Sequence, residues 1–143
     1  FDAASDMLMS GASIRNILDA TGNSKNLPTL QVWGLAMSRL QYDEERGLAY
    51  TVLTQGDIKK FGATTNDLEG LASFLNTLKD AKMILVLYEL GDGRVKGSFR
   101  TNRDDVDVSK LAQALGGGGH AKAAGFEVEG KLTQKNGHWQ IVT

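Results

Sequence analysis

The sequence predicts an α/β fold, in which a mixed β-sheet is flanked by helices and preceded by a helical remnant or linker. Two observations carry this prediction. Segments with alternating or continuous apolar residues, typical of strands, lie at 48–54, 83–88, 94–100 and 126–129. Segments whose apolar residues recur at helical spacing lie between them. Interleaved strands and helices pack most readily as a sheet covered by helices.

The composition indicates a globular chain with one core. Of 143 residues, 41% are hydrophobic and 23% are charged, and the net charge is −1. This near-neutral total excludes strong non-specific binding to nucleic acid, so any anion site must be local. The absence of cysteine excludes disulfides and thiolate metal sites. Because the sequence shows no long apolar run and no signal peptide, we expect no membrane partner and a cytoplasmic location.

The first forty residues predict helices and a connector. Asp2–Met9 and the segment after Ser13 carry short helical patterns, and a polar linker follows at 21–26. Pro28 suits the first turn of a further helix. The apolar residues of this helix keep helical spacing: Leu30, Trp33, Ala36, Met37 and Leu40.

A strand, two helices and a second strand follow. The strand at 48–54 leads into a short helix that ends at Gly62. Asn66 and Glu69 have the spacing of a capping box, which predicts one continuous helix through Leu78. The continuous apolar run at 83–88 predicts a central strand.

The hairpin around Gly91–Gly93 leads into a strand with two different faces. Its alternation places Val95, Gly97 and Phe99 on one face, and Arg94, Lys96, Ser98 and Arg100 on the other. An aspartate, Asp105 or Asp107, caps the next helix, which carries Val108, Leu111, Ala112 and Leu115 along one side. Near the C-terminus, Asn136-Gly137 predicts a second hairpin.

The most distinctive stretch is the glycine run 116–119, followed by His120 and by small residues up to Gly125. Consecutive glycines permit positive φ angles at which amide N–H groups turn toward one point, and this predicts a cradle for an oxyanion. The run lacks the Lys-Ser/Thr pair of a phosphate-binding P-loop and follows a helix, unlike a dinucleotide fingerprint. Candidate binding residues are therefore Ser98, Arg100, Gly117, Gly118, Gly119 and His120.

No complete catalytic set is present in the sequence. His120 and His138 stand apart from acidic clusters, so no metal ligands are assigned, and no serine or cysteine nucleophile motif occurs. Lys122 and His138 are expected at the surface. Two alternatives remain open: Arg94, Lys96 and Arg100 form an ordinary solvated strand face, and His120 is a structural histidine.

The segment 117–125 resembles the GGGHxxAAG signature of the DHH-associated C-terminal domain of the DHH phosphoesterase superfamily. Three other segments are similar to the nanoRNA phosphodiesterase and pAp phosphatase branch, in the same order: Asp67–Leu71, Val95–Thr101 and Val106–Ser109. The resemblance covers roughly residues 28–130. This sequence departs from the branch at two other positions. The branch commonly has Asn or Asp where Ser73 stands, and Arg where Asn76 stands.

The resemblance implies a substrate-binding domain at 28–130, with the tail of a catalytic domain and a linker at 1–27 and a β-hairpin extension at 131–143. It implies that Gly117–Gly119 and His120 hold a terminal nucleotide or its phosphate, assisted by Ser98 and Arg100. Short oligoribonucleotides, pAp, and linear or cyclic dinucleotides are the implied substrates. The implied partner is an N-terminal catalytic DHH domain with two manganese ions, and a homodimer of the full-length protein is a further expectation.

Since no cofactor is expected in this chain, we expect the chain alone to hydrolyse nothing. Two other readings remain open. One is an RNA-binding accessory module related to the C-terminal domain of alanyl-tRNA synthetase, which usually has Arg where His120 stands. The other is an oligomerisation or structural domain whose glycine run is merely packed.

Overall fold

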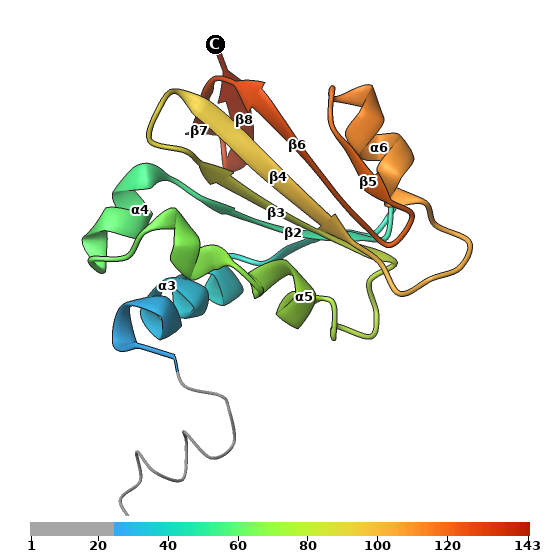
Figure 1. Ribbon diagram of the computed structural model, residues 1–143, viewed down its shortest axis with the longest axis horizontal. Coiled ribbons are helices and arrows are strands. Elements are labelled where there is room, and N and C mark those ends of the chain that lie inside the picture. The colour runs from blue at the N-terminus through green and yellow to red at the C-terminus, as the bar shows by residue number, and fades with distance from the viewer. Residues whose placement is uncertain (1–24) are drawn as a thin grey trace, which may run out of the picture.

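The computed structural model describes residues 25–143, and its main feature is a six-stranded mixed sheet with the order β1-β2-β3-β4-β6-β5 (Figure 1). The strands of this sheet are β1 Gln41–Asp43, β2 Leu48–Leu53, β3 Met83–Glu89, β4 Arg94–Arg100, β5 Gly118–His120 and β6 Ala123–Glu129. Only β2 and β3 pair in parallel, and every other neighbouring pair is antiparallel. The predicted α/β class, with a mixed sheet flanked by helices, is confirmed.

The remaining elements cover the sheet or extend it. The helices are α3 Leu27–Ser38, α4 Gln55–Lys60, α5 Leu71–Leu75 and α6 Val108–Ala114, with a 3-10 turn at Thr65–Leu68. A separate two-stranded sheet consists of β7 Lys131–Lys135 and β8 His138–Val142. Its turn residues, Asn136 and Gly137, both have positive φ (53° and 78°), as the predicted two-residue hairpin requires. The helical patterns expected at 2–9 and after Ser13 lie outside the described residues.

Two different layers cover the two faces of the sheet. On one face, α3, α4 and α5 pack over β2 and β3 around a core that includes Val32, Leu71 and Ile84. On the other face, α6 packs over β4 and β6, where Phe99 and Phe126 are buried. The hairpin of β7 and β8 adds Leu132 to this second face. The first layer covers β2 and β3 and reaches β4 through α5, whereas α6 lies on the opposite face of β4 and β6 (Figure 1).

The helix expected from Asn66 to Leu78 is wrong, because two short elements replace it. The cap is formed by Thr64 and Asp67 at the 3-10 turn, and Gly70 then takes a left-handed conformation with φ of 87° before α5 begins. A continuous helix would require a right-handed Gly70. Trp33 of α3 holds the segment just before this break, because its indole N–H donates to the Asp67 carbonyl at 2.7 Å.

An ion pair joins the end of α3 to the start of α4. Arg39 donates twice to the carboxylate of Asp57, at 2.5 and 3.0 Å, and Asp57 also accepts from the backbone N–H of Thr54 to complete a capping box. Burial opposes ionisation of Asp57, but the bonds from Arg39 and Thr54 outweigh it and lower the pKa of this carboxyl below its ordinary value. The charged carboxylate therefore stabilises the fold.

Replacing Asp57 by asparagine is expected to lower the free energy of unfolding by about 1 kcal/mol at neutral pH, since a cap and a charged bond are weakened. Because the pKa is lower in the folded state, the stabilisation is complete above the unfolded pKa of roughly 4 and is lost as the pH falls through the folded pKa. Denaturant unfolding of both proteins between pH 7 and pH 2.5 measures this. The exposed Asp92→Asn is the control and is expected to change the stability much less than Asp57→Asn does. A difference between wild type and Asp57→Asn that persists at the lowest pH would contradict the prediction.

Candidate functional site

The polar face of β4 forms one wall of a groove. The alternation of β4 is as predicted: Val95, Gly97 and Phe99 are buried, whereas Lys96, Ser98 and Arg100 are half-buried on the opposite face. Gly97 is required on the buried face, because a Cβ there would lie 2.3 Å from the ring of Phe126. Packing on one face thus orients Lys96, Ser98 and Arg100 toward the other face, where α5 reaches Arg100.

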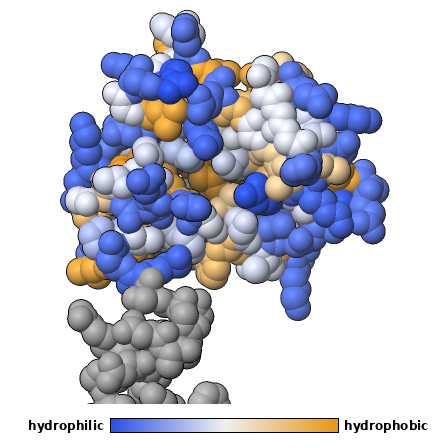
Figure 2. Space-filling model, viewed as in Figure 1, coloured by the Kyte–Doolittle hydropathy of each residue, from blue (hydrophilic) through white to orange (hydrophobic). Residues whose placement is uncertain are grey.

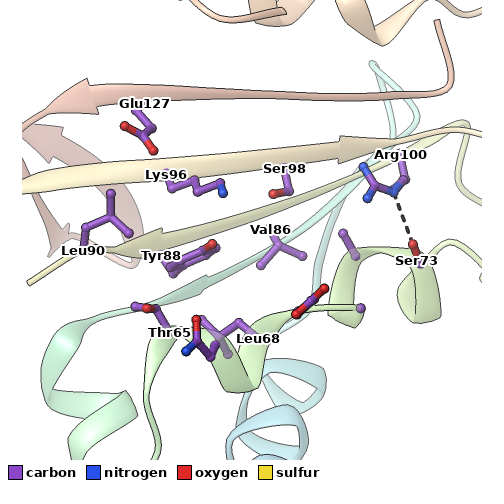
Figure 3. A pocket seen from close by; sticks show the side chains of 14 residues that line it. Thr65, Leu68, Ser73, Val86, Tyr88, Leu90, Lys96, Ser98, Arg100 and Glu127 are labelled. Carbon is purple, nitrogen blue, oxygen red and sulfur yellow. Dashed lines mark hydrogen bonds between the residues drawn. The ribbon is translucent and has the colours of Figure 1, made fainter. Parts of the chain in front are cut away.

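The groove is a cavity of 410 Å³ between β4 and the segment that runs from the 3-10 turn into α5 (Figure 3). This volume lies within the range of roughly 300–1,000 Å³ that is typical of small-molecule sites. The residues that line it come from three parts of the fold. They are Lys96, Ser98, Arg100 and Glu127 from β4 and β6, Val86, Tyr88 and Leu90 from β3 and the residue after it, and Thr65, Asn66, Leu68, Glu69, Gly70, Ala72 and Ser73 from the helical wall. Figure 2 shows hydrophobic residues among hydrophilic ones at the centre of the viewed face.

Arg100 spans the two walls of the groove. Its Nε donates to the hydroxyl of Ser73 on α5 at 3.2 Å (Figure 3). Its Nη1 donates to the Phe99 carbonyl at 3.1 Å. No ion pair within residues 25–143 includes Arg100. The guanidinium is therefore held in place by neutral partners, with its charge and other N–H groups available to an anion. Ser73, where the resembled branch has Asn or Asp, is the residue that positions it.

The strand register places the other candidates on the same face of the sheet. Ser98 pairs with Gly125, which pairs with Gly118, and Arg100 pairs with Ala123, which pairs with His120. Paired residues of neighbouring strands project to the same side. With strands about 4.8 Å apart, the Cα atoms of Arg100 and His120 are separated by roughly 10 Å across β6. The side of β4, β6 and β5 that carries Lys96, Ser98, Arg100, Gly118 and His120 is named the ligand face, because four of these five residues are predicted binding residues.

Only small side chains stand in the middle of the ligand face, on β6. Ala123 lies between Arg100 and His120, and Gly125 lies between Ser98 and Gly118. A Cβ at Gly118 would have nothing within 4 Å, so this glycine borders open space. A ligand that lies across β6 can therefore contact both sides.

The glycine run does not form the cradle of converging amides that the sequence predicts. The N–H of Gly116 donates to the Gln113 carbonyl at 3.0 Å, and the N–H of Gly117 donates to the Ala112 carbonyl at 2.8 Å. Both groups thus terminate α6 and are not directed at an anion, while the rest of the run pairs with β6 as strand β5. Gly117 instead permits close packing, since a Cβ there would lie 2.1 Å from the Gly125 carbonyl oxygen.

Gly119 lies on the other side of β5 from Gly118 and His120. It has φ of 144° and pairs with Ala124, which is buried on the α6 side. The ligand face therefore takes Ser98, Arg100, Gly118 and His120 from the predicted set, and Gly117 and Gly119 support the strand that carries two of them.

The sequence reasoning missed Lys96, Tyr88 and the helical wall as parts of the groove. Lys96 alternates with Ser98 and Arg100, which is a signal for the same face, but Tyr88 and Glu69 reach the groove only through the strand order and the break at Gly70. Arg94 behaves as a solvated strand residue, paired with Asp92 at 2.6 Å and with Glu127. Lys122 is exposed and pairs with Asp104 at 2.9 Å.

Within the described residues, no group of three histidine, aspartate or glutamate side chains is arranged to hold a metal ion. The residues at hand thus do not fit the manganese ions of the resembled enzymes, and no chemical step through a metal is assigned to them. Every helix in the described region is too short or too polar to cross a membrane. The chemistry that this face offers is recognition of an anion by a guanidinium, a hydroxyl and an imidazole.

Comparison with known proteins places the chain in a family. Residues 45–136 match the DHHA1 domain. An uncharacterized Mycoplasma pneumoniae protein, the MG371 homolog, is 34% identical over 86 residues, which are 59% of this chain and 25% of that protein. The match to this curated relative therefore spans about a quarter of the relative's length.

Two solved structures align with this chain. An exopolyphosphatase-related protein from Bacteroides fragilis aligns with a TM-score of 0.72 and 25% identity, over 90% of this chain and 37% of that protein. The C-Ala domain of Aquifex aeolicus alanyl-tRNA synthetase aligns with a TM-score of 0.45 and 18% identity, over 57% of this chain and 75% of that domain. Because the DHHA1 match covers well over half of the sequence and includes the sheet of the ligand face, this chain belongs to the DHHA1 domain family.

Proposed function

We propose that this chain is the nucleotide- and phosphate-binding domain of a DHH-family phosphoesterase that acts on short oligoribonucleotides, pAp or dinucleotides. The observation that carries the proposal is the common placement of Ser98, Arg100, Gly118 and His120 on the ligand face, beside a groove of 410 Å³. The match to an exopolyphosphatase-related structure over 90% of the chain supports the same class of enzyme.

In this proposal the chain binds and orients the substrate and does not cut it. Arg100 and Ser98 hold a phosphate from β4, and His120 and Gly118 contact the ligand from β5. Hydrolysis belongs to a separate catalytic DHH domain, whose manganese ions supply the activated water when bound. The domain boundaries at residues 27 and 130, a homodimer of the full-length protein and a cytoplasmic location also stay predictions.

The groove favours a small ligand over a folded RNA. Its lining carries two cations, Lys96 and Arg100, and two carboxylates, Glu69 and Glu127, so it is not a broadly positive surface. Recognition of a long phosphate backbone requires many cations along its path. The tRNA-binding function of an accessory module is therefore the less favoured reading.

Equilibrium titration of this chain with a diribonucleotide and with folded tRNA tests the proposal. We expect weak but saturable binding of the dinucleotide, on the order of millimolar because the chain offers only one side of a cleft, and no tighter binding of tRNA per site. Clear preference for tRNA would reverse the assignment. Release of mononucleotide from the diribonucleotide by this chain alone, with manganese present, would contradict the division of roles.

A further inference from the structure

We propose that the groove binds two successive nucleotides of one short oligonucleotide. Arg100 and Ser98 hold one phosphate, Lys96 holds the next, and Tyr88 beside Lys96 supports the second base. This inference rests on the proposed function and specifies its substrate class as chains of at least two nucleotides. It assigns Lys96 and Tyr88 as specificity-determining residues.

The charge of Lys96 is available to a ligand. No ion pair among residues 25–143 includes Lys96, although a carboxylate lies directly across the strand pair in Glu127. That carboxylate is paired with Arg94, which also holds Asp92 at 2.6 Å. Glu127 is thus engaged by Arg94 rather than by Lys96, and Lys96 remains as the second cation of the groove.

When their side chains are extended away from the sheet, Lys96 and Arg100 are too far apart to bind the same phosphate. Lys96 and Arg100 are four residues apart on β4, so their Cα atoms are separated by about 13 Å, with Ser98 midway. The guanidinium of Arg100 is tied to Ser73 on the helical wall. A phosphate bound by Arg100 and Ser98 leaves Lys96 to a neighbouring phosphate of the same ligand.

An aromatic ring lies next to the second cation. Tyr88 pairs with Lys96 across β3 and β4, so both side chains lie on the same side of the sheet and line the groove (Figure 3). The ring is half-buried, and it packs on one side against the core beneath α3 and α5. A base that stacks on an aromatic ring while a nearby cation binds its phosphate is the common arrangement for single-stranded nucleic acid.

The groove also continues beyond Lys96. A second hollow is lined by Lys96, Glu127, Gly125 and Phe126 together with Gly116 and Gly117. Lys96 and Glu127 thus border both spaces. A ligand that enters at Arg100 has room to extend past Lys96 toward the glycine run.

Titrations of the full 143-residue chain with AMP and with the 5′-phosphorylated diadenylate pApA test this. Wild type is expected to bind pApA about tenfold more tightly than AMP. Lys96→Met is expected to weaken pApA binding about fivefold and AMP binding less than about twofold. Lys110→Met is the matched control, because Lys110 is exposed on α6 on the opposite face, and it should change neither affinity.

Tyr88 is tested with two variants. Tyr88→Phe keeps the ring and should retain the preference for pApA, whereas Tyr88→Leu should lose most of it. If Tyr88→Leu does not fold, the Lys96 comparison and Tyr88→Phe decide the proposal.

Four outcomes would overturn the inference. Equal affinities of wild type for AMP and pApA, or equal effects of Lys96→Met and Lys110→Met on pApA, would remove the second phosphate position and leave the proposed function standing. Loss of AMP binding in Lys96→Met as large as the loss of pApA binding would place the first phosphate at Lys96 instead. Failure of wild type to bind either ligand would overturn both the inference and the proposed function.

Discussion

Replacing Gly117 by alanine is expected to lower the free energy of unfolding by about 3 kcal/mol or to prevent β5 from pairing with β6. The added Cβ would lie 2.1 Å from the Gly125 carbonyl oxygen and 2.7 Å from the Cα of Phe126. Both atoms belong to the backbone, so no side-chain rotation relieves the overlap. Such a loss is a large part of the roughly 5–15 kcal/mol that stabilises a typical domain. Denaturant unfolding measures it.

Gly118→Ala is the matched control for this prediction. The chemical change is the same and the site is the next residue, but a Cβ at Gly118 would have nothing within 4 Å. We expect a stability within about 0.5 kcal/mol of wild type. Similar losses of stability in the two variants would contradict the division of the glycine run into a packing residue and a ligand-facing residue.

Replacing Arg100 by methionine is expected to weaken binding of a 5′-phosphorylated dinucleotide by about tenfold to a hundredfold, which corresponds to the loss of a charge-assisted hydrogen bond to phosphate. Methionine keeps much of the apolar stem and removes the guanidinium. Because the Arg100 bond to Ser73 is exposed and its bond to the Phe99 carbonyl is only partly buried, the stability should change little. Isothermal titration calorimetry on both proteins measures the affinities.

Arg103→Met separates a local effect from a change of total charge. Arg103 is exposed, pairs with Asp105 at 2.8 Å and does not line the groove. Both variants remove one positive charge from the chain, so general electrostatic attraction falls equally. An effect of Arg103→Met as large as that of Arg100→Met would show that Arg100 does not contact the phosphate.

Local patterns were sufficient to predict most of the elements. The alternation along β4 correctly placed Ser98 and Arg100 opposite the buried Phe99, and Asn136-Gly137 correctly predicted a hairpin. These features depend on side-chain period and turn chemistry within a few residues. The end of α4 near Gly62, which has φ of 70°, and the cap of α6 by Asp107 are of the same kind.

The predictions failed where distant contacts decide the structure. The spacing of Leu68, Leu71 and Leu75 fits one helix, but the contact of Trp33 with Asp67 accompanies a left-handed Gly70 that divides it. The strand at 41–43 was missed because three mostly polar residues carry no period, and only the pairing with β2 reveals it.

The glycine run shows why the site was only partly predictable. The sequence indicates that the backbone at 116–119 can adopt positive φ angles, but not which groups accept hydrogen bonds from its amides. The amides of Gly116 and Gly117 donate to carbonyls at the end of α6, and the rest of the run pairs with β6. The approach of Arg100 and His120 depends on β6 lying between β4 and β5, which is a matter of strand order. The resemblance named Arg100 and His120 as candidate binding residues, and the strand register places them on the same face of the sheet.

The most direct test of the central claim, that the ligand face of β4, β6 and β5 binds nucleotide phosphate, is a map of amide chemical shifts during titration with pApA. The account predicts that the largest shifts fall on Ser98, Arg100, Gly118 and His120, with small shifts on α6 and on the β7–β8 hairpin. Unmoved amides at these four residues under saturating ligand, or largest shifts on the α6 side of the sheet, would contradict it.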